Sequence, residues 1–132
     1  MTRYLLDTNT LSHLIRQQPA VCQRLQSVPM AALCISAITE GELRFGLARR
    51  PEATRLHAAV AELLKRLDVL PWDSSAARHY GNLRAALEQQ GKTVAPLDLL
   101  IASHAAAVGA VLVSNDQVFG QVTGLVWEDW TR

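Results

Sequence analysis

The sequence predicts an α/β fold in three layers, with a short central parallel sheet flanked by helices. Short apolar segments with strand character alternate along the chain with longer segments whose apolar residues recur at helical spacing. This alternation is typical of a parallel sheet covered by helices. The strand-like segments are nearly all apolar, as expected when both faces of a sheet are buried. With 132 residues, 49% of them hydrophobic, the chain has the size and apolar content of one domain spanning residues 1–132.

The strands are predicted from short apolar runs. The run near the N-terminus meets Asp7 directly, and the run that follows the last long helix meets Ser114. Such runs, bounded by polar or turn-forming residues, indicate buried strands. In chain order the predicted strands are residues 3–6, 33–36, 69–71, 111–113 and 125–127.

The helices are predicted from apolar periodicity, and proline or glycine marks most of their boundaries. Pro19 separates the first helix from the second, Pro51 stops the third, and Gly91 ends the fifth. The sixth opens at Pro96 and ends at Gly109. The fourth has apolar residues at helical spacing, namely Leu56, Val60, Leu63, Leu64 and Leu67. In chain order the predicted helices are residues 8–16, a short one after Pro19, 38–49, 52–67, 74–90 and 96–108.

Four acidic residues are candidates for one common site: Asp7, Glu42, Asp98 and Asp116. Asp7 directly follows the first strand, and Asp116 follows the fourth by a short turn. Asp98 lies in the first turn of an otherwise apolar helix, and Glu42 lies inside the third helix. In open parallel sheets, ligands bind beyond the carboxyl ends of the strands. We therefore expect these acids to meet there.

Each acid also has an ordinary structural explanation. Asp is a favoured N-cap, which accounts for Asp7, and the helix dipole favours an acid in the first turn, which accounts for Asp98. An Asn-Asp pair after a strand is a common turn, and a glutamate within a helix is usually solvated. Gly41 and Gly46, on either side of Glu42, each destabilise a helix by about 1 kcal/mol relative to Ala, and they suggest a close approach to this helix.

If the four acids converge, their charges require a counter-ion. Two like charges 4 Å apart repel by about 4 kcal/mol at an effective dielectric constant of 20. A site made of oxygen ligands selects a hard divalent cation, Mg²⁺ or Mn²⁺, and such a site is suited to hydrolysing phosphodiester bonds. Neutral polar groups next to the acids could orient ligands or phosphate: Thr8, Asn9, Ser114 and Asn115.

The composition limits the other classes of function. No apolar run reaches the roughly 20 residues that span a bilayer, and no secretion signal is recognisable at the first residues. Cys22 and Cys34 stand in apolar surroundings without metal-type spacing, which indicates reduced thiols in a cytoplasmic protein. The net charge is only +1, but the basic residues are mostly arginines, which suit phosphate contacts. The best candidates for contacting RNA follow Glu42 closely: Arg44, Arg49 and Arg50.

These acids lie in segments that resemble the motifs of PIN-domain ribonuclease toxins of the VapC type. The resemblance runs from one end of the chain to the other, and its four main motifs stand in the family's order and spacing. The segments are residues 5–9 (LLDTN), 35–43 (ISAITEGEL) with Gly46, 96–102 (PLDLLIA), 113–116 (VSND) with Phe119, and the tail 124–130 (GLVWEDW).

The resemblance implies a PIN-like three-layer fold and a toxin of a type II toxin–antitoxin pair. By it, Asp7, Glu42 and Asp98 are the core metal-binding and catalytic acids, and Asp116 matches the more variable fourth position. It further implies Mg²⁺- or Mn²⁺-dependent endonucleolytic cleavage of structured RNA, with initiator tRNA cut in its anticodon loop as the target. The implied partners are a second copy of the chain in a homodimer and a VapB-type antitoxin, through which alone the pair contacts operator DNA.

Two other functions remain open at this point. A phosphatase with an aspartate nucleophile would need a second acid two residues after Asp7, where Asn9 stands, and a well-placed lysine; the only lysines are Lys65 and Lys92. A catalytically inactive PIN-like module would bind RNA or a protein without cutting it. The presence of all four acids argues against such a module.

Overall fold

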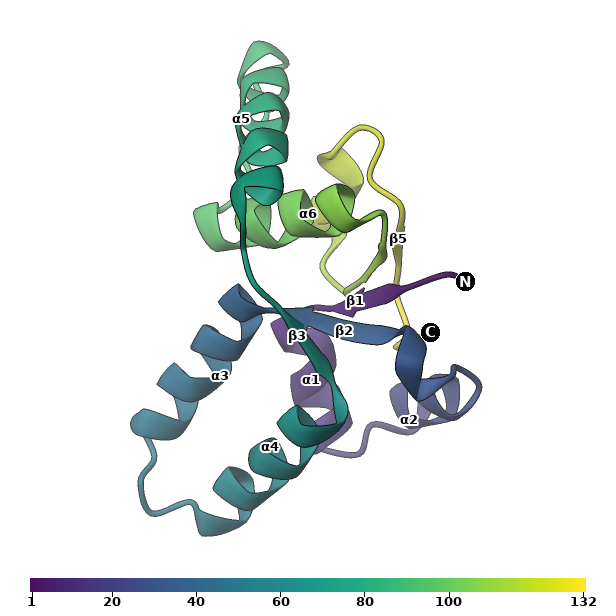
Figure 1. The fold of residues 1–132 in the computed structure, drawn as a ribbon, viewed down its shortest axis with the longest axis vertical. Coiled ribbons are helices and arrows are strands. Elements are labelled where there is room, and N and C mark those ends of the chain that lie inside the picture. The colour runs from purple at the N-terminus through teal and green to yellow at the C-terminus, as the bar shows by residue number, and fades with distance from the viewer.

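The structure, a computed structural model, describes residues 1–132 and confirms the predicted α/β fold (Figure 1). Five parallel strands form one sheet in the order β3-β2-β1-β4-β5, so that the first strand of the chain lies at the centre. Crossovers between parallel strands require intervening helices, which the alternation along the chain supplies. The strands are β1 (Tyr4–Leu6), β2 (Leu33–Ser36), β3 (Asp68–Leu70), β4 (Val111–Val113) and β5 (Trp127–Glu128).

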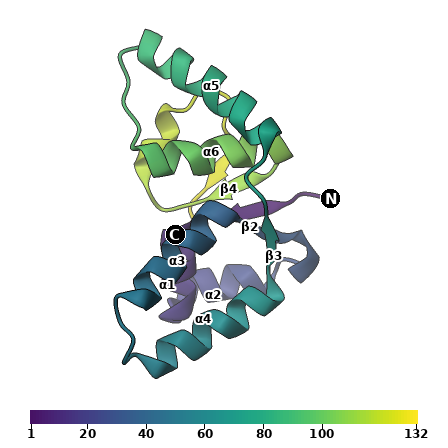
Figure 2. The same cartoon turned by 60° about the vertical axis from the view of Figure 1, so that its left-hand side comes forward.

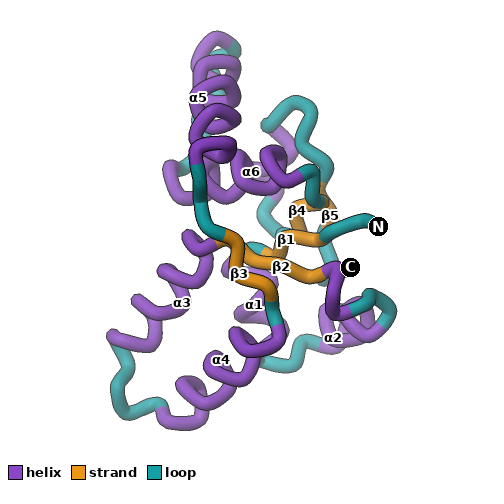
Figure 3. Tube along the Cα trace, viewed as in Figure 1, coloured by secondary structure: helices purple, strands orange, loops and turns teal.

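The helices cover the two faces of the sheet. Figures 1 and 2 show α5 and α6 on one side of it and α1 to α4 on the other, and Figure 3 shows the strands between these two groups. No helix combines the length and the apolar character that crossing a membrane requires. The helices are α1 (Thr8–Ile15), α2 (Pro19–Gln26), α3 (Ala37–Ala48), α4 (Thr54–Arg66), α5 (Ser74–Gln89) and α6 (Pro96–Val108), with two 3₁₀ turns, η1 (Met30–Ala32) and η2 (Gln117–Gln121).

Most predicted elements are confirmed to within a residue or two, and the last strand is the main discrepancy. We predicted a strand at residues 125–127, but β5 is Trp127–Glu128, where Trp127 pairs with Leu112. Val126, which made the apolar run look like a strand, is 62% exposed. The two 3₁₀ turns were not predicted, because three to five residues carry too little periodicity to identify a helix.

The core divides according to the alternation of side chains along the strands. Leu5, Cys34 and Leu112 occupy one row of the sheet and pack under α6, whereas Leu6 and Val113 face α1 to α4. All five are fully buried. Because successive residues of a strand point to opposite faces, a strand of three apolar residues contributes to both cores. This explains why the strands are uniformly apolar.

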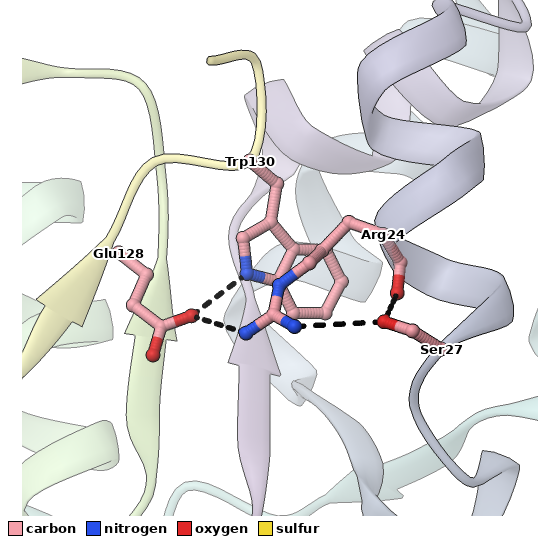
Figure 4. Close-up of polar contacts among 4 residues, drawn as sticks. All are labelled: Arg24, Ser27, Glu128 and Trp130. Carbon is pink, nitrogen blue, oxygen red and sulfur yellow. Dashed lines mark hydrogen bonds and ion pairs between the residues drawn. The ribbon is translucent and has the colours of Figure 1, made fainter.

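The C-terminal residues are held against α2 by a cluster of polar and aromatic groups (Figure 4). Glu128 Oε1 accepts hydrogen bonds from Arg24 Nη2 at 3.2 Å and from Trp130 Nε1 at 3.0 Å. The Arg24 guanidinium also lies over the indole ring, 5.5 Å from its centroid, and Ser27 Oγ donates to the Arg24 carbonyl at 2.6 Å. Trp130 itself is 3% exposed and its ring lies 5.4 Å from that of Tyr4.

We predict that the apolar contacts of Trp130 stabilise this cluster more than its ion pair does. Trp130→Ala should lower the free energy of unfolding by about 3–5 kcal/mol, because it leaves a cavity in the core. Glu128→Gln should lower it by no more than about 1 kcal/mol, because the ion pair is partly exposed and the amide oxygen can still accept from the indole. Denaturant titration of both variants measures the two effects, and equal losses would contradict the prediction.

Candidate active site

Asp7 lies at the centre of the sheet's carboxyl edge, where it is 5% exposed. It caps α1, since its Oδ1 accepts a hydrogen bond from the Thr10 amide at 2.8 Å, so its capping role is real. Thr10 Oγ1 in turn donates to the Val113 carbonyl at 2.9 Å, which joins the start of α1 to the end of β4. Burial raises the pKa of Asp7, although hydrogen bonds from Ser114 and Thr10 oppose that rise. The carboxylate is thus held rigidly in a poorly solvated place.

Glu42 is held from the neighbouring helix. Thr8 Oγ1, in the first turn of α1, donates to Glu42 Oε1 at 2.6 Å, and both residues are half-buried. This bond joins α1 to α3 beside Asp7. Glu42 therefore faces inward from its helix, unlike Glu40, which pairs with Arg44 at 2.7 Å.

Asp98 brings the third carboxylate from the opposite side of the sheet. It is half-buried in the first turn of α6, whose N-cap residue, Ala95, makes no side-chain hydrogen bond. Burial raises the pKa of Asp98, and the negative charges of Asp116, Asp7 and Glu42 raise it further. All three other acids are thus close enough to affect its ionisation. The structure therefore brings the four predicted acids to one edge of the sheet.

Asp116 also has two roles. Its Oδ1 accepts from the Val118 amide at 3.0 Å and caps η2, while its own amide donates to Ser114 Oγ at 3.0 Å. Ser114 is fully buried at the end of β4 and lies between Asp116 and Asp7. The turn explanation is therefore correct, and it does not exclude Asp116 from the acidic site.

Of the other residues predicted to support the site or to contact RNA, only some lie beside the acids. Thr8 and Ser114 make the contacts just described, whereas Asn9 is exposed and Asn115 is half-buried at the rim. Arg50 lines a groove beside Thr8 and Glu42, and Arg16, which we had not singled out, lines it too. The other two predicted arginines point to other contacts, since Arg44 pairs with Glu40 and Arg49 lies over the Phe45 ring at 5.5 Å from its centroid.

The close approach predicted from the two glycines of α3 is not made by any part of this chain. A Cβ added at Gly41 or Gly46 would meet no atom within 4 Å, so neither marks a close approach within the chain. Gly46 instead lines the groove beside Glu42. Sequence reasoning also missed Thr10, although its position three residues after a capping Asp was a usable signal.

The four carboxylates are chemically suited to bind a divalent cation, but they lie further apart than the ligands of a closed metal site. All four acids supply carboxylate oxygens, the ligands that Mg²⁺ and Mn²⁺ prefer, and burial together with neighbouring negative charge raises the pKa of Asp7 and Asp98. No three such side chains lie close enough to enclose a metal ion by themselves. This openness fits Mg²⁺, which is typically held by one or two carboxylates together with water and substrate phosphate.

Comparisons with known proteins agree with this arrangement. The family model described as PIN domain matches residues 4–125. The chain is 36% identical over 132 residues to the tRNA(fMet)-specific endonuclease VapC of Shigella flexneri. The aligned region covers 99% of this chain and 100% of that protein.

Solved structures give the same result. The chain is similar to DNA-bound VapBC from Salmonella typhimurium (TM-score 0.91, 37% identity, 98% of this chain and 99% of that one). It is also similar to VapBC2 from Rickettsia felis bound to a promoter DNA fragment (TM-score 0.90, 31% identity, 98% and 99%). These matches confirm the resemblance first noted in the motifs. The chain belongs to the PIN-domain family and, within it, to the VapC ribonucleases.

Proposed function

We propose that this chain is the toxin of a VapBC pair, a Mg²⁺- or Mn²⁺-dependent endoribonuclease that acts through Asp7, Glu42, Asp98 and Asp116. The observation that carries the proposal is the convergence of these carboxylates at the carboxyl edge of the sheet, where burial and mutual repulsion raise the pKa of Asp98. A carboxylate cluster of this kind holds charge that a divalent cation would neutralise.

A cation bound here would contact phosphate oxygens, lower the pKa of a bound water and stabilise the leaving oxygen. The chain's own residues hold the site in shape. Thr10 and Ser114 fix the Asp7 carboxylate, and Thr8 fixes Glu42. Arg50 and Arg16, at the groove beside Glu42, are placed to contact RNA phosphates.

The substrate and partners of the proposal come from the relatives. The Shigella protein is named for cleavage of tRNA(fMet), and we infer the same class of substrate, a structured tRNA cut in its anticodon loop. The similar solved structures are VapBC complexes, some with DNA, and we infer a VapB-type antitoxin as the partner and as the part that contacts DNA. A homodimer and a cytoplasmic location complete the proposal.

The alternatives predict different chemistry. An aspartate-nucleophile phosphatase would form a covalent phosphate on Asp7 and would need a second acid two residues later, where the uncharged Asn9 is exposed. An inactive PIN-like module would bind RNA without cutting it. RNA cleavage under controlled metal supply separates all three.

We expect purified protein to cut RNA with Mg²⁺ or Mn²⁺ and to stop when EDTA removes the metal. Asp7→Asn and Glu42→Gln should lower the rate by more than about 100-fold, since loss of even an outer partner of a metal site typically lowers affinity or activity about 10–100-fold. Glu40→Gln is the matched control, because Glu40 is on the same helix but pairs with Arg44. Cutting that persists with EDTA and in Asp7→Asn would come from a contaminant and would overturn the proposal.

Asp98→Asn should abolish cleavage and raise the melting temperature of the metal-free protein. The pKa of Asp98 is raised above its ordinary value of 3.8, so its charged form opposes folding at neutral pH. That destabilisation appears as the pH rises above 3.8 and is complete above the raised pKa. The difference in melting temperature between variant and wild type should therefore be largest near neutral pH and vanish below 3.8. A variant less stable than the wild type at pH 7 would instead support a purely structural role for Asp98.

The RNA target is tested by sequencing RNA 5′ ends after induced expression. We expect new 5′ ends to concentrate in the anticodon loop of initiator tRNA, and to be absent when the Glu42→Gln variant is induced. Ends spread over messenger RNA would contradict the proposed tRNA target while leaving the proposed ribonuclease activity intact.

A further inference from the structure

One buried polar contact connects the two helices that carry Glu42 and Asp98. His104 lies on α6 and is 1% exposed, surrounded on its own helix by the buried apolar residues Ile101 and Ala105. Its Nδ1 is 2.7 Å from Ser36 Oγ, which is fully buried at the end of β2. The two residues are 68 positions apart in the chain. Neither takes part in the acidic site.

Ser36 makes a second hydrogen bond that is compatible with its bond to His104. Ser36 Oγ accepts from the Ile38 amide at 3.1 Å and thereby caps α3. The oxygen keeps a second lone pair and its own proton, so it can donate to His104 Nδ1 or accept from it, and the bond forms with either neutral tautomer of the imidazole. Burial lowers the pKa of His104, in agreement with the neutral form.

The hydrogen bond between His104 and Ser36 joins the two helices that carry Asp98 and Glu42. Ser36 caps α3, and Glu42 is on that helix; His104 is on α6, and Asp98 is in the first turn of that helix. We propose that His104 is a positioning residue. Its hydrogen bond with Ser36 fixes the position of α6 relative to α3, and therefore the position of Asp98 relative to Glu42. The inference rests on the proposed metal-dependent cleavage, because it assigns His104 a part in shaping that site.

Two features of α6 explain why a directional bond is needed. The N-cap residue Ala95 makes no side-chain hydrogen bond, so no capping side chain fixes the turn that carries Asp98. Apolar contacts fill space but discriminate weakly between small shifts of a helix, whereas a buried hydrogen bond is costly to break or misalign. One turn before His104, the Leu100 carbonyl accepts a hydrogen bond from Trp72 Nε1 at 3.0 Å. The two bonds join α6 to the end of β2 and to the segment that follows β3.

The test compares two polar replacements of His104 in the full-length protein. In His104→Asn one polar atom of the amide takes the place of Nδ1 and can still form a hydrogen bond with Ser36, whereas in His104→Gln the amide group takes the place of Nε2. We expect the Asn variant to bind Mn²⁺ within about twofold of wild type and the Gln variant about tenfold more weakly, as is typical for groups that orient metal ligands. Mn²⁺ binding is measured by electron paramagnetic resonance without RNA, and circular dichroism verifies folding.

RNA cleavage supplies the second measurement. The Gln variant should have a lower kcat with an unchanged KM for RNA, since the arginines of the groove are unaffected, and the Asn variant should recover kcat. Equal Mn²⁺ affinities in the Asn and Gln variants would overturn the inference. A wild-type protein that binds Mn²⁺ but cuts no RNA would instead overturn the proposed function.

Ser36→Ala tests the same bond from the other side, should a His104 variant not fold. It removes the hydroxyl that forms a hydrogen bond with His104 and is expected to weaken Mn²⁺ binding about tenfold, as His104→Gln does. The double variant Ser36→Ala/His104→Gln should then be no weaker than either single variant, because both remove one bond. Wild-type Mn²⁺ affinity in Ser36→Ala would contradict the inference.

Discussion

The parallel pairing of β1 with β2 on one side and β4 on the other determines the rest of this molecule. It places three strand ends at one edge of the sheet, and Asp7, Ser36 and Ser114 stand at or just beyond these ends. Because parallel strands need helical crossovers, each strand end also begins a helix or a turn. The same geometry therefore supplies the core, the helix caps and the acidic residues, and none of them can be moved without moving the others.

Bringing like charges to this edge is unfavourable, and the neighbouring groups offset part of the repulsion. Asp7 is deeply buried yet accepts hydrogen bonds from Thr10 and Ser114, and Glu42 accepts one from Thr8. Asp98 has no such compensation at its helix cap, and its pKa responds to all three other acids. The site is thus rigid on the α1 side and electrostatically strained on the α6 side. A folded protein retains such strain where binding of an opposite charge relieves it.

The sequence predicted the fold class and the four acids because these leave local signals. Pro96 and Gly109 mark α6, and Asp7 ends a strand and caps a helix in one step. Contacts between distant segments leave no such signal. The bond from His104 to Ser36 depends on how α6 packs over β2, and the shared environment of Asp98 and Glu42 depends on the order of strands in the sheet. The error at β5 has the opposite origin, since Val126 is apolar and yet exposed.

The structural duty of Asp116 does not require its charge. It caps η2 through a single side-chain oxygen, and Asn caps a helix about as well as Asp does. An exchange between the two at this position changes the net charge of the acidic edge by one while the turn stays in place. The number of negative charges facing a cation or a phosphate can therefore be adjusted there, which makes this corner one point for tuning how strongly the edge attracts metal and repels RNA.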